Sequence, residues 1–208
     1  GVRDRLAHLL DAALHPLAMR PDGAELPRSY NISLGRPLLE HPLVGKAIAL
    51  LSLGAGRAPI EQSQLSALLL GPFWAGDVSE ADARALLDAS MRRQLPYFTT
   101  PAGLQRLAER DHHDCPKTCA ALATGAAAFE KAPRNQLPSD WAGLFRQALG
   151  GFGWPGERSL SSDEFQAHRA FVEVLSGFGR FDTLLGRLGL GAALARLRDL
   201  CRARLFQP

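Results

Sequence analysis

The fold class is decided by residues 161–178, which read SSDEFQAHRAFVEVLSGF. Ser161 and Glu164 have the spacing of a capping box, in which each side chain accepts a hydrogen bond from the other residue's backbone N–H, so a helix is predicted to begin there. The residues of this helix that can pack against other helices lie around most of its circumference: Phe165, His168, Phe171, Val172, Leu175 and Phe178. Because a helix that is apolar on more than one side is usually packed between others, this stretch predicts a multi-helix domain.

Helical signals recur along the rest of the chain. Apolar residues at helical spacing, with prolines in first turns, predict helices over residues 3–14, about 39 or 42 to 53, 60–70, 80–94, 101–110, 116 to 129 or 131, 138–149 and from about 191 onward. Ser79 and Asp82 have the spacing of a second capping box. The predicted class is all-α or nearly so, with roughly nine helices.

One segment has the alternation of a β-strand. Between Arg28 and Leu34, apolar residues alternate with Ser29, Asn31 and Ser33. We expect this small element to be the only substantial strand, with the region 97–99 as its candidate partner.

The chain is expected to form one helical domain over residues 1–208, with a sub-boundary, if there is one, near residues 132–138. It has no initiator methionine and ends without a polar tail, which is the pattern of a segment excised from a larger protein. Of its residues, 46% are apolar and 22% are charged, which is ordinary for a globular fold and is enough to build a core.

The positive charge is concentrated at the C-terminal end. The formal net charge is +3, but the residues from Arg180 onward carry +4 and the others therefore sum to −1. The positive charge comes from six arginines: Arg180, Arg187, Arg196, Arg198, Arg202 and Arg204. This split predicts a local basic surface and argues against a protein that is coated uniformly by nucleic acid.

The cysteine content and the hydropathy of the chain indicate its cellular compartment. Three cysteines are too few for a disulfide framework, so free thiols in a reducing compartment are expected. The apolar stretch 47–53 is far shorter than the ~20 residues that cross a bilayer. No signal peptide opens the chain. We expect a cytoplasmic protein with no membrane partner.

The sequence contains no motif of a known catalytic site. It has no Gly-x-x-x-x-Gly-Lys-Ser/Thr phosphate loop, no Gly-x-Ser-x-Gly elbow and no His-Glu-x-x-His zinc helix. The predicted strand 28–34 carries no acid that could hold the divalent cation of a nuclease. No catalytic residue, no enzymatic activity and no cofactor are therefore expected for this segment.

One cluster has the chemistry of metal ligands. The weak candidates are His112, His113, Cys115 and Cys119, and the two cysteines are one helical turn apart. Their spacing matches no common zinc site. A polar loop followed by a half-buried cysteine is the preferred interpretation, so no metal is predicted.

Arginines are the candidate nucleic-acid contacts. Arg198 and Arg202 should lie beside an apolar helical stripe, with Arg196 on the other flank, where guanidinium groups could hold phosphates. The stripe is formed by Leu190, Leu194, Leu197, Cys201 and Leu205. Arg92 and Arg93 are a second candidate pair. A solvated helix face is the alternative for each of these arginines.

Two further residues have a functional and a structural interpretation. Trp154 could stack on a nucleobase, but beside Gly153 and Pro155 it is more simply explained as a core residue under a turn. His168 lies on an apolar helix face, where a core histidine is expected before a catalytic base.

Three segments resemble superfamily 1 helicase-like DNA repair proteins. Residues 30–38 (YNISLGRPL), followed by HPLV at 41–44 and an apolar helix, are similar to the region of UvrD/Rep helicases and AddB-type subunits that precedes an inserted accessory subdomain. Residues 153–166 (GWPGERSLSSDEFQ) resemble a segment of bacterial probable DNA repair proteins related to AddB. Residues 205–208 (LFQP) resemble the approach to the next motor segment.

The resemblance implies an inserted, largely helical accessory domain of a DNA repair and recombination protein. Its implied partners are the motor domains of the parent polypeptide, duplex DNA and a partner helicase or nuclease subunit. The family's ATP-binding, helicase and nuclease motifs match nothing in this chain, so those roles are not carried over. Two other functions stay open: a protein–protein adaptor with no nucleic-acid role, and a small metalloprotein, which we rank last.

Overall fold

The structure is a computed structural model that describes residues 2–19, 35–56, 59–110 and 113–207. The chain divides into two compact units, one made of residues 1–36 with 205–207 and the other of residues 37–204. The sequence suggested one domain, and it placed a sub-boundary near residues 132–138, which lie inside the second unit. The strand predicted over residues 28–34 lies outside the described residues.

The first unit contains helix α1 (Val2–Leu14), as the pattern over residues 3–14 predicts, and the 3-10 helix η1 (Pro16–Met19). It also holds Arg36 and strand β6 (Leu205–Phe206), which forms a two-stranded sheet with β1 (Arg36–Pro37). The apolar side of α1 is open within this unit, since Leu6, Leu9 and Leu14 are exposed.

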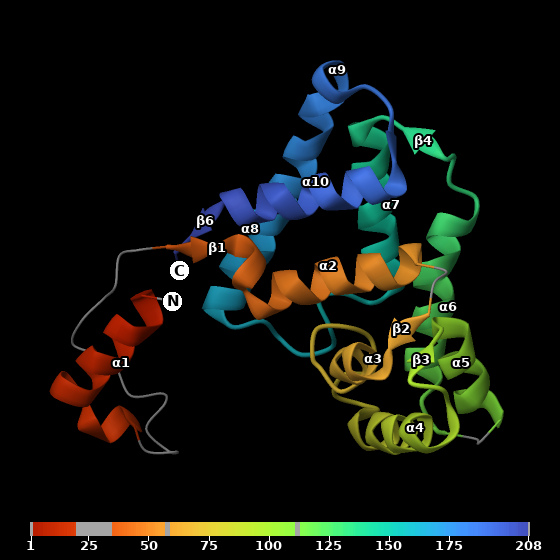
Figure 1. The fold of residues 1–208 in the computed structure, drawn as a ribbon, viewed down its shortest axis with the longest axis horizontal. Helices are drawn as coiled ribbons and strands as arrows, with labels where there is room; N and C mark the ends of the chain where they lie inside the picture. Colours follow the sequence, from red (N-terminus) through yellow and green to blue (C-terminus); the bar gives the residue numbers. More distant parts are fainter. Residues whose placement is uncertain (1, 20–34, 57–58, 111–112, 208) are drawn as a thin grey trace. The chain divides into compact units, whose positions relative to one another are not determined.

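The second unit is built almost entirely of helices (Figure 1). Its longer helices are α2 (Pro42–Ala55), α3 (Gln62–Leu69), α4 (Ala81–Gln94), α5 (Pro101–Arg110), α6 (Pro116–Glu130), α7 (Pro138–Gly151), α8 (Ser162–Phe178) and α10 (Leu190–Ala203). Short turns of helix are η2 (Leu38–Glu40), η3 (Gly179–Phe181) and α9 (Asp182–Leu185). The predicted all-α or nearly all-α class is confirmed.

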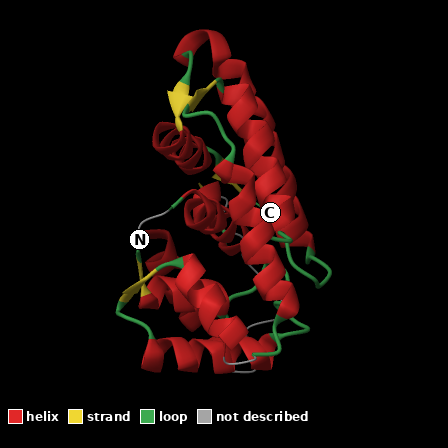
Figure 2. Cartoon of the chain, turned by 90° about the vertical axis from the view of Figure 1, so that its right-hand side faces the viewer, coloured by secondary structure: helices red, strands yellow, loops and turns green. Residues whose placement is uncertain are grey.

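The strands of this unit are two residues long and tie loops together (Figure 2). β2 (Ile60–Glu61) pairs antiparallel with β3 (Phe98–Thr99), and β4 (Asn135–Gln136) pairs antiparallel with β5 (Leu188–Gly189). The helix expected over residues 60–70 therefore begins at Gln62, because its first two residues pair with β3. β2 is a partner for the region 97–99 that the sequence did not predict.

Helix α2 lies at the centre of the second unit, where it contacts α3, α6, α7, α8 and α10 (Figure 1). Most of its circumference is buried, with seven of its residues in the core: Leu43, Val44, Ala47, Ile48, Leu50, Leu51 and Leu53. A buried leucine of this kind contributes about 2–5 kcal/mol relative to alanine. The packing of five helices on one apolar helix therefore fixes the arrangement of the unit.

Helices α6 and α7 approach each other closely at two glycines. A Cβ atom at Gly125 would lie 2.5 Å from the ring of Phe152, and one at Gly151 would lie 3.1 Å from the backbone of Gly125. Side chains at these positions would push the helices apart, so the glycines allow Phe152 to be fully buried between them.

Helix α8 begins with the capping box that its sequence predicts. Glu164 N–H donates to Ser161 Oγ at 3.3 Å, and Ser161 N–H donates to Glu164 Oε2 at 2.8 Å. The helix packs against α2, α7 and α10, so it does lie between other helices. Its core side is narrower than predicted, because Phe171, Leu175 and Phe178 are buried whereas Phe165 is exposed.

Replacing the capping serine should destabilise the protein. Ser161→Ala removes the acceptor for the Glu164 N–H, and we expect the free energy of unfolding to fall by about 1 kcal/mol in urea denaturation. Ser159→Ala is the matched control, because Ser159 is exposed and lies outside the helix, and it should change stability by less than about 0.5 kcal/mol. Equal stability of the two variants would contradict the capping role.

Candidate nucleic-acid interface

The C-terminal arginines lie on α10, which is anchored by a narrow apolar side. Ala193, Leu197 and Cys201 are fully buried where the helix packs on α2, α7 and α8. The predicted stripe is correct at Leu197 and Cys201. It is wrong at Leu205, which lies beyond the end of the helix and is 68% exposed.

Arg198 and Arg202 lie one turn apart on one flank of α10, and both are exposed. Arg198 donates a long hydrogen bond of 3.5 Å to Ser52 Oγ on α2. Arg202 forms an ion pair of 2.8 Å with Asp199 of the same helix, and both side chains are more than half exposed. Exposed pairs of this kind contribute only ~0–1 kcal/mol, so a phosphate can replace the carboxylate at little cost.

Two other arginines of α10 and its C-terminal end are also exposed. Arg196 is exposed on the opposite flank of α10, as its helical position predicts. Arg204, just past the helix, forms an exposed ion pair of 3.3 Å with Glu173 of α8. The basic character of α10 is therefore only partly neutralised by Asp199 and Glu173.

Arg92 and Arg93, at the end of α4, differ in how they are held. Arg92 Nε donates to the buried carboxylate of Asp88 at 2.9 Å, and Arg92 Nη2 donates to Ser66 Oγ at 3.0 Å, while Ser66 also bonds to Asp88. Arg92 thus closes a network between α3 and α4, which favours a structural role over phosphate binding. Arg93 is exposed and makes one hydrogen bond, of 3.3 Å, to Ser90 Oγ.

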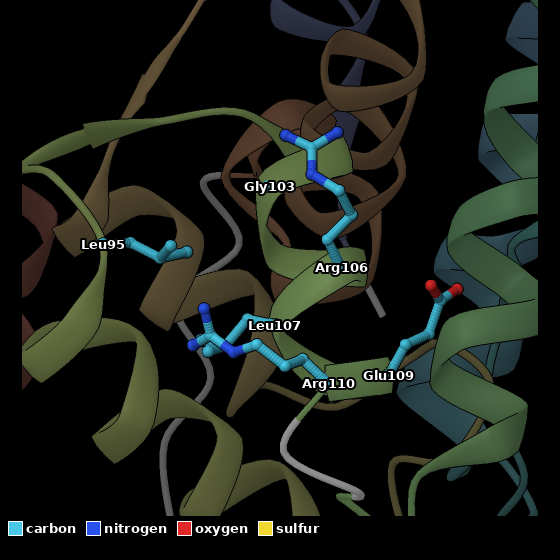
Figure 3. A pocket seen from close by; sticks show the side chains of 6 residues that line it. All are labelled: Leu95, Gly103, Arg106, Leu107, Glu109 and Arg110. Carbon is cyan, nitrogen blue, oxygen red and sulfur yellow. The ribbon is translucent and has the colours of Figure 1, made fainter.

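An open hollow of about 560 Å³ lies between the end of α4 and α5 (Figure 3). Arg106 and Arg110 line it from successive turns of α5, with Leu95 on the facing segment. Arg110 extends toward the Leu95 side of α5 and donates to Gln94, and the acidic Glu109 also lines the hollow. Neither arginine of this hollow stands out in the sequence, because two arginines on a short amphipathic helix look like an ordinary solvated face.

Two exposed aromatic residues lie between Leu95 and α5 in the sequence. Tyr97 and Phe98 are 58% and 60% exposed, and their rings meet edge to face with centroids 5.1 Å apart. The Tyr97 hydroxyl donates to Glu61 at 2.5 Å. Adjacent large aromatic side chains that face solvent are unusual, because burial of each ring would otherwise contribute to stability.

Of the candidate metal ligands, Cys115 and Cys119 are within hydrogen-bond reach of each other. His112 lies outside the described residues, and no group of three His, Cys, Asp or Glu side chains placed to hold a metal is found among the others. Cys115 is buried just before α6, and burial raises the pKa of its thiol to about 12. The pKa of half-buried Cys119 is also raised, first by burial, and His113 bonds through its backbone to Ala108. These surroundings favour thiols over the thiolates that bind zinc.

Trp154 is half-buried, and protein groups contact its ring and its Nε1. Its ring stacks on His168 at 4.8 Å and meets Phe171 edge-on at 5.4 Å, and its Nε1 donates to the carbonyl of Leu43 at 3.1 Å. Burial lowers the pKa of His168, which favours the neutral ring in this stack. The contacts agree with the structural interpretation of both residues.

A buried polar network around Arg84 was not foreseen from the sequence. Arg84 of α4 is 2% exposed, and its Nε donates to Thr118 Oγ1 at 2.8 Å while its Nη2 donates to the Ala75 carbonyl at 2.6 Å. Its guanidinium carbon lies 4.0 Å from the ring centre of Trp74. Burial lowers the pKa of Arg84 to about 10, so the group stays charged at neutral pH.

Glu80 connects this network to the start of α6. Its carboxylate accepts from the backbone N–H groups of Lys117 and Thr118 at 2.6 and 2.8 Å, and from Thr118 Oγ1 at 2.7 Å. These are first-turn donors of a helix N-terminus, where a negative charge is favourable. The buried charges are bonded to protein groups, and the network therefore joins α4 to α6 without offering a reactive group.

The predicted capping box at Ser79 and Asp82 is wrong. Helix α4 begins at Ala81 without a side-chain cap, and the Ser79 hydroxyl instead donates to Glu157 at 2.9 Å. Glu157 also accepts from the Ser79 N–H and from Lys117 Nζ, and the Lys117 contact is the main cause that lowers its pKa to about 2. A partner 78 residues away in the sequence outcompetes the local cap.

Comparison with known proteins gives no family for this chain, since no family model, no curated protein and no solved structure matches it. Among the helices that the structure describes, none combines the length and the apolar content that a bilayer crossing requires. The function is therefore inferred from the placement of the side chains.

Loss of the Glu80 charge should destabilise the fold. Glu80→Gln places an amide NH₂ against backbone donors, and we expect it to lower the free energy of unfolding by about 1–3 kcal/mol in urea denaturation. Asp82→Asn is the matched control, because Asp82 is exposed in the first turn of the same helix. It should cost less than about 0.5 kcal/mol, and an equal cost for both variants would contradict the role of Glu80.

Thiol reactivity tests the surroundings of the cysteines. In the native protein at pH 8, iodoacetamide should modify Cys119 before Cys115 and Cys201, because the latter two are buried with pKa values of about 12. Mass spectrometry of peptides gives the order, and all three should react in denaturant. Joint protection of Cys115 and Cys119 that a chelator abolishes would instead support the metal site.

Proposed function

We propose that this chain is a non-catalytic accessory domain of a DNA repair helicase or exonuclease-like protein, and that it guides duplex DNA through phosphate contacts made by α10. The observation that carries the proposal is the exposure of four arginines along α10 and at its C-terminal end, Arg196, Arg198, Arg202 and Arg204, while the apolar side of the helix is buried. The resemblance of residues 30–38, 153–166 and 205–208 to AddB-like proteins supplies the DNA repair context.

The geometry of α10 suits phosphates better than bases. Arg198 and Arg202 are one turn apart on a rigid helix, so their guanidinium groups can bridge the phosphates of a backbone. Such contacts position a duplex and carry no sequence information. Guidance of DNA past a motor needs this kind of contact, since the motor must move along any sequence.

A protein–protein adaptor is the second candidate function. Phe165 on α8 and Leu184 on α9 are large apolar side chains that are 54% and 76% exposed, and exposed apolar groups can mark a docking face. An adaptor that docks the motor on a partner subunit would need no DNA contact. The two functions therefore differ in whether α10 binds DNA.

Removal of two α10 arginines should flatten the salt dependence of DNA binding. Each phosphate contact releases about one counterion, so Arg198→Ala/Arg202→Ala should reduce the slope of log K against log salt by roughly 2. Affinity should fall evenly across duplex sequences. The measurement is fluorescence anisotropy with a forked duplex at several salt concentrations.

The matched control is Arg146→Ala/Arg169→Ala, which removes two exposed arginines from α7 and α8 and keeps the same net charge as the test variant. This control should leave the slope near the wild-type value. No binding by the wild-type chain, or the same slope in test and control variants, would remove the DNA-guiding role and leave the adaptor.

A further inference from the structure

We propose that an open hollow between α8, η3 and α10 binds an acidic segment of a partner protein that carries one large apolar side chain. In this arrangement the apolar side chain fills the hollow, and carboxylates on either side of it pair with Arg180 and Arg204. Such a docking site goes beyond the DNA contact proposed for α10 and does not depend on it, although Arg204 belongs to both.

The walls of the hollow are mainly apolar. Its volume is about 320 Å³, and the residues that line it are Val174, Gly177, Arg180, Phe181, Leu200 and Arg204. The three large apolar residues among them are half-buried, so each is packed against the unit and still lines the hollow. This volume is at the lower end of the ~300–1,000 Å³ of ligand pockets, and it suits one large side chain better than a nucleic-acid duplex.

Gly177 keeps the hollow open. It is the last residue but one of α8, and inside a helix glycine is less favourable than alanine. A Cβ atom at Gly177 would meet no atom within 4 Å beyond its chain neighbours and the backbone of its own helix. At Gly125 and Gly151, by contrast, a Cβ would collide with close neighbours. Close packing therefore does not explain the glycine at this position, whereas an occupant that needs the space does.

The charge of the hollow favours an acidic partner. Arg180 and Arg204 line it from η3 and from the end of α10, and both are exposed. A guanidinium group can donate two parallel hydrogen bonds to a carboxylate, so arginines beside an apolar hollow suit acidic residues next to an apolar one. A DNA backbone could also contact these arginines, but it has no large apolar group to fill the hollow. An acidic segment with one large apolar side chain uses both features.

Two acidic residues near the hollow already have partners. Glu173 of α8 pairs with Arg204 at 3.3 Å, and both side chains are more than half exposed. Exposed pairs of this kind contribute little to stability, so a carboxylate of the partner can replace Glu173. Asp182 accepts from the Ser139 N–H at 2.9 Å. Because Glu173 competes for Arg204, removal of its charge should strengthen the binding of an acidic segment.

The first experiment measures binding of a fluorescein-labelled peptide to the full chain by anisotropy. The peptide has one phenylalanine flanked on both sides by aspartates and glutamates. The wild type should bind it, and the affinity should fall about 10-fold or more when the phenylalanine is replaced by alanine, since a buried aromatic anchor carries much of the binding energy of an interface. Replacement of the acids by their amides should weaken binding as well.

Variants of the chain then locate the peptide. Gly177→Leu should weaken binding about 10-fold or more, because the new side chain occupies the hollow. Gly143→Leu is the matched control, since Gly143 also lies inside a helix, α7, and a Cβ there also meets no atom within 4 Å. Arg180→Ala should weaken binding and reduce its salt dependence. Glu173→Gln should strengthen binding more than Glu130→Gln, which removes an exposed glutamate from α6 and changes the net charge equally.

Further measurements separate docking from a folding defect and from DNA binding. All variants should retain the wild-type circular dichroism, and Arg180→Ala tests the site independently of Gly177→Leu. At physiological salt, Arg198→Ala/Arg202→Ala should leave peptide binding within twofold, and Gly177→Leu should leave duplex binding unchanged.

No peptide binding by the wild type, or equal affinities of Gly177→Leu and Gly143→Leu, would overturn the docking site and leave the DNA contact of α10 untouched. Weaker duplex binding by Gly177→Leu would assign the hollow to DNA and would also overturn it. Loss of duplex binding in Arg198→Ala/Arg202→Ala has no bearing on the hollow, so the two proposals can fail separately.

Discussion

Burial of most of α2 is the constraint on which the second unit depends. A helix with leucine, isoleucine, valine and alanine over most of its circumference is stable in water only if other helices cover those residues. Here α3, α6, α7, α8 and α10 do so. Because α10 must turn its apolar residues toward α2, its arginines are directed to solvent, and the basic surface is a consequence of the core packing.

The buried carboxylate of Glu80 stabilises the N-terminus of α6 in the same unit. The N-cap residue of α6, Cys115, makes no side-chain hydrogen bond to the first-turn N–H groups of the helix. These groups therefore need an acceptor from elsewhere. Glu80 supplies that acceptor from α4, and Arg84 balances the charge through Thr118. These hydrogen bonds hold the start of α6 beside α4. They thereby also position α5 and the hollow that α5 lines.

Local signals in the sequence predicted the helices, the cap at Ser161 and the exposed sides of Arg198 and Arg202, because they depend on residues within one or two turns. Contacts between distant residues could not be read in this way. Ser79 has the spacing of a cap, yet its hydroxyl bonds to Glu157, and Arg92 looks like a solvated residue, yet it completes the Ser66–Asp88 network. The exposure of Tyr97 and Phe98 was also hidden, since their burial is decided by the pairing of β3 with β2.

The DNA-contacting role can be mapped directly by nuclear magnetic resonance. A ¹⁵N-labelled chain titrated with a short duplex of mixed sequence reports contacts residue by residue, without any substitution. We predict that the largest shifts fall on residues 196–204 and on the side-chain Nε–H signals of Arg198 and Arg202, and that they shrink as salt is raised. Shifts that are absent there, or confined to the exposed apolar residues of α8 and α9, would contradict the account.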